Sequence, residues 1–431
     1  MFQTLSNFLR VKDIRNKIIF TLLMLIIFRI GTFITVPFTD QSAIQFMMSQ
    51  QNMFGFINTF GGGALENFSI FAMGIMPYIT ASIIMQLLQM DVVPKFAEWK
   101  KQGEMGRKKI AQVTRYAAVG IAFVQAIAMS IGFNAMAGGL LIQDPGVIKF
   151  LTIAIVLTGG TAFLMWLGEQ ITAHGVGNGI SIIIFAGIVA AIPNGAGQIY
   201  NQYFSNPGSE LFINIVIVTL IVLVVIAVTV GIIFVNEALR KIPVQYAKKL
   251  VNRTPVGGQS THLPIKVNAA GVIPVIFAIA FMIAPTTIAG FFEGNQVANI
   301  VTYVFDYTQP VGMIIYVALI IAFSYFYTFV QVNPEQMSEN LQRQGGYIPG
   351  IRPGHNTEEY LTRVIRRLTF VGALFLAAVS VFPIILGGLA NLPQTVQIGG
   401  TSLIIVVGVA LTTMKQLEGQ LVKRHYKGFI K

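Results

Sequence analysis

The sequence predicts an all-α polytopic membrane protein with ten transmembrane helices, and both composition and hydropathy pattern point to this class. Of the 431 residues, 54% are hydrophobic and 11% are charged, whereas a soluble domain carries about 25% charged residues. The apolar residues gather into segments that recur along the chain and are long enough to cross a bilayer. A water-soluble fold does not fit this composition.

Ten apolar segments follow one another along the chain. They cover residues 18–36, 68–90, 113–133, 150–171, 180–199, 211–235, 272–292, 311–332, 368–389 and 398–417. The basic start leads directly into the first segment without a small-residue cleavage site, so that segment is expected to remain as an anchor. The fifth segment is the weakest, because glycines and Pro193 interrupt it. A membrane helix tolerates such residues when neighbouring helices satisfy its backbone.

The distribution of Lys and Arg predicts that both ends of the chain lie in the cytoplasm. The chain has 29 such residues, with 4 before the first segment, 7, 6 and 5 in every second loop, and 5 at the C-terminal end, which places 27 on one side. Arg29 lies inside the first segment, and Lys149 is alone on the other side. Cytoplasmic loops carry an excess of Lys and Arg, so the cation-rich side is expected to be cytoplasmic.

The segments divide into two halves of five. Residues 1–200 form the predicted N-terminal half and residues 211–431 the C-terminal half, with the polar stretch 201–210 between them. Because five is odd, the second half starts from the opposite side of the membrane, which is the arrangement of an inverted-topology repeat around a central pathway. The sequence therefore predicts two inverted, pseudo-symmetric halves.

Residues 54–67, FGFINTFGGGALEN, fit neither a spanning helix nor a plain loop. The stretch is moderately apolar, too short to span, and interrupted by three consecutive glycines. Two readings stay open from the sequence: a re-entrant half-helix inside a protein-lined cavity, where irregular backbone is tolerated, or a helix lying in the membrane interface.

Two cytoplasmic loops, residues 236–270 and 333–367, are too long to be simple connections, and such loops are usually functional. Each carries turn residues beside cations. In the second loop, Pro349, Gly350, Pro353 and Gly354 are expected to fix a rigid turn that presents Arg352. Such a loop suits an acidic partner or RNA phosphate, although a basic loop is most often only a determinant of topology.

The predicted membrane spans contain almost no ionisable residues and no catalytic motif. Only Arg29 and Glu169 approach the middle of a span, and both lie close enough to helix ends to reach the interface or to pair with neighbours. The chain has no cysteine, no phosphate-binding Gly-rich loop and no zinc-protease motif. The sequence therefore predicts no catalytic residue, no metal, no cofactor and no enzymatic activity, and the energy for any work must come from a partner.

Six motifs carry a resemblance to the bacterial SecY family, the SecY/Sec61-alpha family of central subunits of protein-conducting channels. They are FAMGIMPYITAS at 71–82, FLMWLGEQIT at 163–172, GVGNGISIIIFAG at 175–187, QSTHLP at 259–264, IPGIRPG at 348–354 and GGTSL at 399–403. The resemblance runs from the first segment to the last. It implies a passive pore that conducts unfolded preproteins across the cytoplasmic membrane and releases transmembrane segments sideways into it.

The resemblance assigns a pore ring of aliphatic residues at mid-membrane. Isoleucines spaced four apart share a helix face, which by itself indicates only packing or a lipid-facing surface. Carried over motif by motif, the ring positions are Ile75, Ile79, Ile180, Ile184, Ile276 and Ile405. Flexible aliphatic side chains can close around a polypeptide, yet they offer an ion no substitute for its hydration shell.

The resemblance also assigns a plug and a lateral gate. The plug falls in the stretch 54–67, on Phe56, Ile57, Asn58, Thr59, Phe60, Gly61, Gly62, Gly63, Ala64 and Leu65. The gate lies between the second, third, seventh and eighth segments. Thr80, Gln86 and Thr287 are expected to line it and to set how hydrophobic a segment must be to open it.

The implied partners dock on the cytoplasmic side. Expected contacts with the SecA ATPase and the ribosome are Arg240, Lys241, Lys248, Lys249, Arg253 and Arg352. Two departures from the family pattern, Glu237 and Pro243, make this surface less basic than in many relatives, and a third, Thr35, replaces a common proline near the end of the first helix. The small membrane subunits SecE and SecG, the proteins SecDF and YidC, signal-peptide substrates and anionic lipids complete the expected partners.

Two other classes share parts of this pattern. An inverted-repeat secondary transporter has similar gross topology, but it needs charged or coordinating residues at mid-membrane, where this chain has aliphatic ones. An intramembrane enzyme needs paired catalytic groups at depth, and the interior residues do not supply them.

Overall fold

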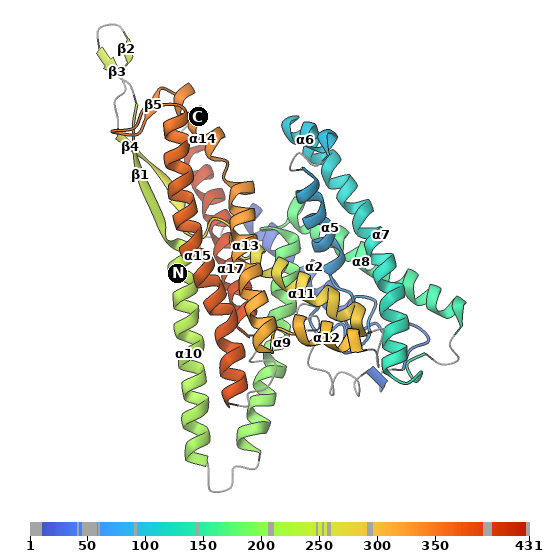
Figure 1. Ribbon diagram of the computed structural model, residues 1–431. Helices are drawn as coiled ribbons and strands as arrows, with labels where there is room; N and C mark the ends of the chain where they lie inside the picture. Colours follow the sequence, from blue (N-terminus) through green and yellow to red (C-terminus); the bar gives the residue numbers. More distant parts are fainter. Residues whose placement is uncertain are drawn as a thin grey trace.

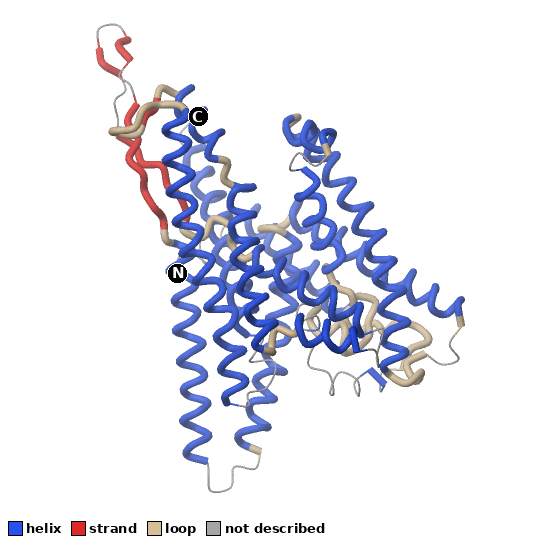
Figure 2. Tube along the Cα trace, viewed as in Figure 1, coloured by secondary structure: helices blue, strands red, loops and turns tan. Residues whose placement is uncertain are grey.

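The computed structural model is an almost entirely helical protein with a small set of strands at one end (Figures 1 and 2). It describes residues 11–40, 43–44, 58, 61–89, 93–142, 146–205, 211–246, 249–251, 254–256, 260–290, 296–390 and 399–427. The helices are α2 (Lys12–Gly31), α5 (Met76–Leu87), α6 (Pro94–Lys101), α7 (Glu104–Met136), α8 (Val147–His174), α9 (Gly179–Phe204), α10 (Leu211–Glu237), α11 (Ile273–Gly290), α12 (Gln296–Phe305), α13 (Pro310–Gln331), α14 (Pro334–Arg343), α15 (His355–Ala390) and α17 (Gly399–Lys427).

Each of the ten predicted segments overlaps one of these helices. In the described part of the chain, seven helices are long and apolar enough to cross a membrane, namely α7, α8, α9, α10, α13, α15 and α17. Helices α5, α11 and α12 are apolar but shorter, and α2 carries charged residues in its first two turns and again at Arg29. The protein is therefore a multi-pass membrane protein, and the count of ten crossings stays a prediction.

Two predicted boundaries are wrong, and a single long-range contact explains both. The first helix ends at Gly31 and not at residue 36, and the second begins at Met76 and not at residue 68. The two freed stretches pair with each other, with a β-bridge between Thr35 and Ser69. Gly74, with φ 56°, closes the turns that precede α5, and proline in the first turn of α5 favours the helix start there.

Close backbone contacts between helices depend on glycine. A Cβ on Gly179, the first residue of α9, would lie 1.9 Å from the carbonyl oxygen of Gly168 in α8. A Cβ on Gly160, also in α8, would lie 1.8 Å from the carbonyl oxygen of Ile70. Small residues allow membrane helices to approach closely, so α8 is packed directly against the backbone of two other segments.

Helix α10 lies at the edge of the bundle in Figure 1, and its side chains face outward almost all round. Ile232 is its only buried residue, in the helix with the highest mean hydropathy of the seven spans. Helix α10 packs against α9 and α17. A helix that is apolar on every face and so little covered by protein is suited to contact lipid or another membrane subunit.

The two long loops fold together as one unit at the cation-rich end, which we call the cytoplasmic module after the side on which the distribution of Lys and Arg predicts it to lie. Strand β1 (Leu239–Tyr246) pairs antiparallel with β4 (Ser260–Lys266), in a register that matches Leu239 with Lys266. On its other edge β1 pairs with β5 (Gly346–Tyr347) from the second loop. A short hairpin of β2 (Lys249–Val251) and β3 (Thr254–Val256) forms the tip.

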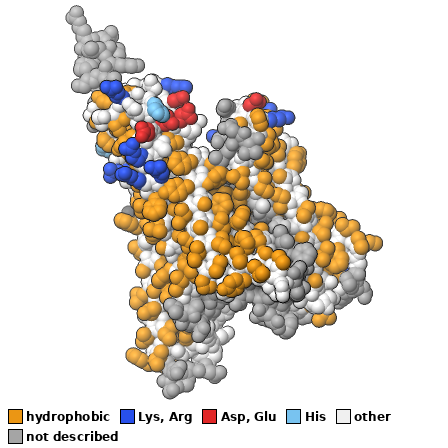
Figure 3. Space-filling model, viewed as in Figure 1, with side chains coloured by type: hydrophobic (Ala, Val, Ile, Leu, Met, Phe, Trp, Pro, Cys, Tyr) orange, Lys and Arg blue, Asp and Glu red, His pale blue; other side chains and the backbone are white. Residues whose placement is uncertain are grey.

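A small hydrophobic core joins the strands of the cytoplasmic module to α14 and the start of α15. It contains Ile242, Val244 and Ile265 from the strands with Leu341 and Leu361 from the helices. The prediction treated the two loops separately, and this is a correction: inward-facing residues that alternate along β1 need a partner to bury them, and the second loop supplies it. Figure 3 shows Lys and Arg side chains gathered at this end, above a helical body covered by hydrophobic side chains.

Candidate functional site

The six predicted ring residues converge from four helices into one hydrophobic cluster. Ile75 and Ile79 come from the start of α5, Ile180 and Ile184 from α9, and Ile276 and Ile405 from α11 and α17. Four of them are buried, and Ile180 and Ile276 are half-buried. Helices from both halves of the chain therefore meet at this cluster, which is what a constriction between the halves requires.

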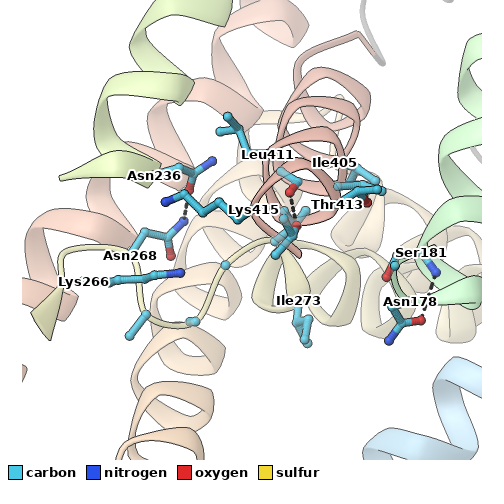
Figure 4. A pocket seen from close by; sticks show the side chains of 18 of the residues that line it. Asn178, Ser181, Asn236, Lys266, Asn268, Ile273, Ile405, Leu411, Thr413 and Lys415 are labelled. Carbon is cyan, nitrogen blue, oxygen red and sulfur yellow. Dashed lines mark hydrogen bonds between the residues drawn. The ribbon is translucent and has the colours of Figure 1, made fainter. Parts of the chain in front are cut away.

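A cavity of about 450 Å³ adjoins this cluster (Figure 4). Its walls include three of the ring isoleucines, Ile184, Ile276 and Ile405, and combine apolar side chains with polar residues at the ends of α9, α10 and α13, in the middle of α17 and in the turn after β4. Because β4 belongs to the cytoplasmic module, the cavity lies on the cation-rich side of the cluster.

The polar walls of the cavity are held by side-chain contacts between elements. The Asn268 Nδ2 donates to Asn236 Oδ1 at 2.9 Å, and Lys415 Nζ lies 2.7 Å from a carboxylate oxygen of Glu237. The Asn178 side chain accepts hydrogen bonds from the backbone N–H groups of Ile180 and Ser181 and so caps α9. Glu237, one of the departures from the family pattern, is thus neutralised inside the cavity wall.

These cavity residues were not predicted from the sequence. Asn178, Asn236 and Asn268 come from three different connections, and no local pattern links them. The position of Asn178 directly before an apolar run is the one available signal, because Asn is a favoured helix N-cap.

Residues 61–67, the longer described part of the predicted plug, do not form a helix, which corrects the prediction for this stretch. Residues 54–57, 59 and 60 lie outside the described residues, Asn58 is helical, and residues 61–67 form successive turns. Gly62 and Gly63 adopt left-handed backbone with φ 66° and 85°, and a right-handed helix cannot continue through such residues. The segment is nevertheless packed: Ala64 is fully buried in the ring cluster, and Leu65 is fully buried against residues of α7 and α8.

The seam assigned to the lateral gate brings α5 against α11, and these helices also pack on α7 and α13 respectively. Thr80 and Gln86 both bond within α5, from Thr80 Oγ1 to the Met76 carbonyl at 3.1 Å and from Gln86 Nε2 to Ser82 Oγ at 3.4 Å. In the described structure the Gln86 Oε1 atom is buried without a partner. The side chain of Thr287 lies outside the described residues.

The predicted docking residues lie on the cytoplasmic module. Arg240 and Lys241 are exposed on β1, and Arg352 is exposed in the turn after β5. That turn is built by Gly350 and Gly354, both with left-handed φ, and its carbonyls accept hydrogen bonds from Ser338 and Thr357. Lys248 and Arg253 lie outside the described residues, as does the side chain of Lys249.

Glu169, one of the two ionisable residues predicted to lie inside a span, is paired as expected. Its Oε1 lies 2.6 Å from Arg115 Nε, and both side chains are partly exposed. An exposed pair of this kind contributes little to stability. Glu169 is the only acidic residue described in the α8 span. Because it is paired with Arg115, this span offers no carboxylate for a buried relay.

Comparison with known proteins gives a consistent family. The SecY family model matches residues 69–414. The protein translocase subunit SecY of Halalkalibacterium halodurans is 66% identical over 100% of both chains.

Solved structures show the same fold. A SecY channel whose plug domain stabilises the closed state aligns over 97% of this chain and 95% of that chain, with a TM-score of 0.63 at 20% identity. Sec61 in the canine ribosome–channel complex of the endoplasmic reticulum aligns over the same shares, with a TM-score of 0.59 at 19% identity. From the family model and the full-length identity together, this chain belongs to the SecY family.

Proposed function

We propose that this chain is the pore-forming subunit of a Sec translocon in the cytoplasmic membrane. The observation that carries the proposal is that six isoleucines from α5, α9, α11 and α17 belong to one hydrophobic cluster, which also borders a cavity with mixed polar and apolar walls and contains Ala64 of the glycine-rich segment. The sequence relative named above is a protein translocase subunit, which supports the same function. The transporter alternative is not favoured, because the ring cluster is built from hydrophobic side chains.

The ring acts as the seal. Isoleucine side chains exclude water from a narrow passage and offer no dipoles to replace the hydration shell of an ion, so ions are rejected without any charged gate. A polypeptide brings its own apolar side chains and can displace the isoleucines, which are flexible enough to close around it. The chain itself performs no chemistry, and the proposal is of a passive channel and not of an enzyme.

The α5–α11 seam is the proposed sideways exit. A hydrophobic segment gains several tenths of a kcal/mol per apolar residue on entering lipid, so a sufficiently apolar segment can separate the two helices. Thr80, Gln86 and Thr287 are the proposed polar lining of that exit. The Gln86 Oε1 atom, a buried acceptor without a partner in the described structure, fits this role, because such an acceptor at the seam would destabilise its closed state.

The cytoplasmic module is the proposed docking surface for the SecA motor and the ribosome. One of the solved neighbours is a ribosome-bound Sec61, and Arg240, Lys241 and Arg352 project from one folded unit that can present all three to one partner. We place both chain ends in the cytoplasm on the same ground, since the module carries many of the cations. SecE and SecG are proposed to cover apolar outer helices such as α10.

Site-specific crosslinking to a stalled nascent chain tests the proposed function. The chain has no cysteine, so single cysteines report one position each. We expect Ile184→Cys and Ile405→Cys to form disulfide adducts with a cysteine in the translocating chain. Ile226→Cys is the matched control, because Ile226 is exposed on the outer face of α10. Adducts at Ile226 and none at the two ring positions would show that the substrate takes another path.

A further inference from the structure

Arg29 places a cation beside the glycine-rich segment, and the contact has a specific geometry. Arg29 is in the last turn of α2 and is half-buried. Its Nη1 donates a hydrogen bond to the backbone carbonyl of Gly62, and its guanidinium carbon lies 4.7 Å from the centre of the Phe33 ring. A planar guanidinium can make both contacts at once, because its donors lie in the plane and its face stacks on the ring.

Gly62 sits where the segment is most tightly enclosed. A Cβ on this residue would lie 3.1 Å from the Gly187 Cα in α9 and 3.6 Å from the Phe28 ring in α2. Two residues further on, Ala64 is fully buried in the cluster that contains the ring isoleucines. The Arg29 contact therefore holds the part of the segment that packs in the same cluster as the ring isoleucines.

The far end of the segment is held in a different way. Backbone hydrogen bonds join Val36 N to Phe68 O at 3.0 Å and Ile70 N to Ile34 O at 2.9 Å, on either side of the Thr35–Ser69 bridge. This short ladder is a fixed attachment. The contact at Gly62 is made by one side chain and can be broken without disturbing the ladder.

We propose that Arg29 is a positioning residue that latches the plug in its seated position through the Gly62 carbonyl. This inference rests on the proposed function, because it assumes that the segment is a plug. A hydrogen bond from a charged donor shifts an equilibrium by about ten- to a hundredfold. That range is large enough to keep the plug seated at rest and small enough for an entering polypeptide to overcome.

A buried reporter measures the latch directly. In the cysteine-free chain, in its assembled complex in membranes, Ala64→Cys is expected to react slowly with a membrane-impermeant maleimide applied from the extracytoplasmic side. Arg29→Met keeps the length and apolar stem of the side chain but removes the donors, and it is expected to raise the labelling rate about ten- to a hundredfold. Arg29→Lys keeps the charge without the planar fork and is expected to give a smaller increase.

Arg115→Met is the matched control, since it breaks the ion pair with Glu169 and touches none of the segment's described contacts. It is expected to leave the labelling of Ala64→Cys unchanged. An equal increase in the Arg115→Met channel, or no increase in the Arg29→Met channel, would overturn the latch.

Ion currents in planar bilayers separate the latch from the plug assignment. Arg29→Met is expected to raise the resting current, and deletion of residues 61–65 is expected to raise it further. In a channel that lacks residues 61–65, Arg29→Met should not raise the resting current further, because the Gly62 carbonyl is absent. A further rise in current in that channel would overturn the latch. A deletion without any leak would overturn the plug assignment, and faster labelling of Ala64→Cys in Arg29→Met would then still support the contact itself.

Discussion

In the proposed channel, individual residues set the seal through shape and not through charge. The ring isoleucines belong to one hydrophobic cluster, and Gly179 lets α9 start directly against the backbone of α8. That contact places Ile180 and Ile184, one and five residues later, at the ring cluster. Asn178 fixes the same helix start by capping it. The ring is therefore positioned by small and polar residues that take no part in the seal.

Replacing Ile75, Ile79, Ile184 and Ile405 together with Asn is expected to make the resting channel leak ions. Amide side chains bind water and give an ion partial replacement for its hydration shell, so the constriction no longer dewets. Single-channel recording in planar bilayers measures the effect. As a control, replacing the same four positions with Leu conserves volume and polarity, and currents should stay at the wild-type level. If the channel with four Asn residues does not leak, the ring assignment is wrong.

At the scale of elements, the sequence predicted local features well and long-range pairing poorly. Hydropathy located every described apolar helix except the short α12, because each signal lies within one segment. The stretch 68–75 was predicted to be helical, yet residues 68–70 pair with residues 34–36 and residues 71–75 form turns, and no local pattern reveals a partner more than 30 residues away. The cytoplasmic module was missed for the same reason, since β1 and β5 come from different loops.

Arg352→Glu is expected to block motor-driven secretion while the channel stays folded. The Arg352 side chain is exposed, and the turn is held through its backbone carbonyl, which accepts a 2.9 Å hydrogen bond from Thr357 Oγ1. Charge reversal is therefore expected to leave the turn folded and to change only the charge of the surface that a partner contacts. Translocation of a SecA-dependent preprotein into inverted vesicles measures the loss.

The control for this variant is Arg343→Glu, which makes the same charge change on α14 within the same module. Arg343 is exposed, and among the described residues its ion pair is with Glu339 one turn away, an interaction worth a few tenths of a kcal/mol. We expect Arg343→Glu to secrete at close to the wild-type rate. Equal secretion by the two variants, whether normal or abolished, would remove the specific role of Arg352.

For the whole molecule, the two halves meet along two different seams. On one side α9, the last helix of the first half, packs on α10 and α17 of the second. On the other side α5 packs against α11. Since α9 and α10 are consecutive in the chain, the first seam is covalently tied and suits a hinge, and the second is the seam that we propose can part. Charge and hydropathy predicted where the spans lie in the sequence and on which side their ends lie. Which helices form the two seams follows only from how the helices pack in the structure.

Single-cysteine labelling tests the orientation of the whole molecule in the membrane. Arg352→Cys is expected to react with an impermeant maleimide only from the cytoplasmic side, and Leu140→Cys only from the outside. Leu140 is 73% exposed in the turn between α7 and α8, so both thiols are accessible and differ in side alone. Intact right-side-out and inverted vesicles give the comparison. Labelling of both positions from the same side would reverse or refute the predicted topology.

The Thr35–Ser69 bridge has a kinetic consequence for the proposed plug. Ser69 follows Ala64 by five positions, so once displaced, Ala64 can travel at most about 17 Å from its tether. A group confined to so small a volume meets its own binding site at an effective concentration in the millimolar range or above. After a substrate has left, the channel then closes by an intramolecular return of the tethered plug. The rate of this return does not depend on how many channels or partners the membrane contains.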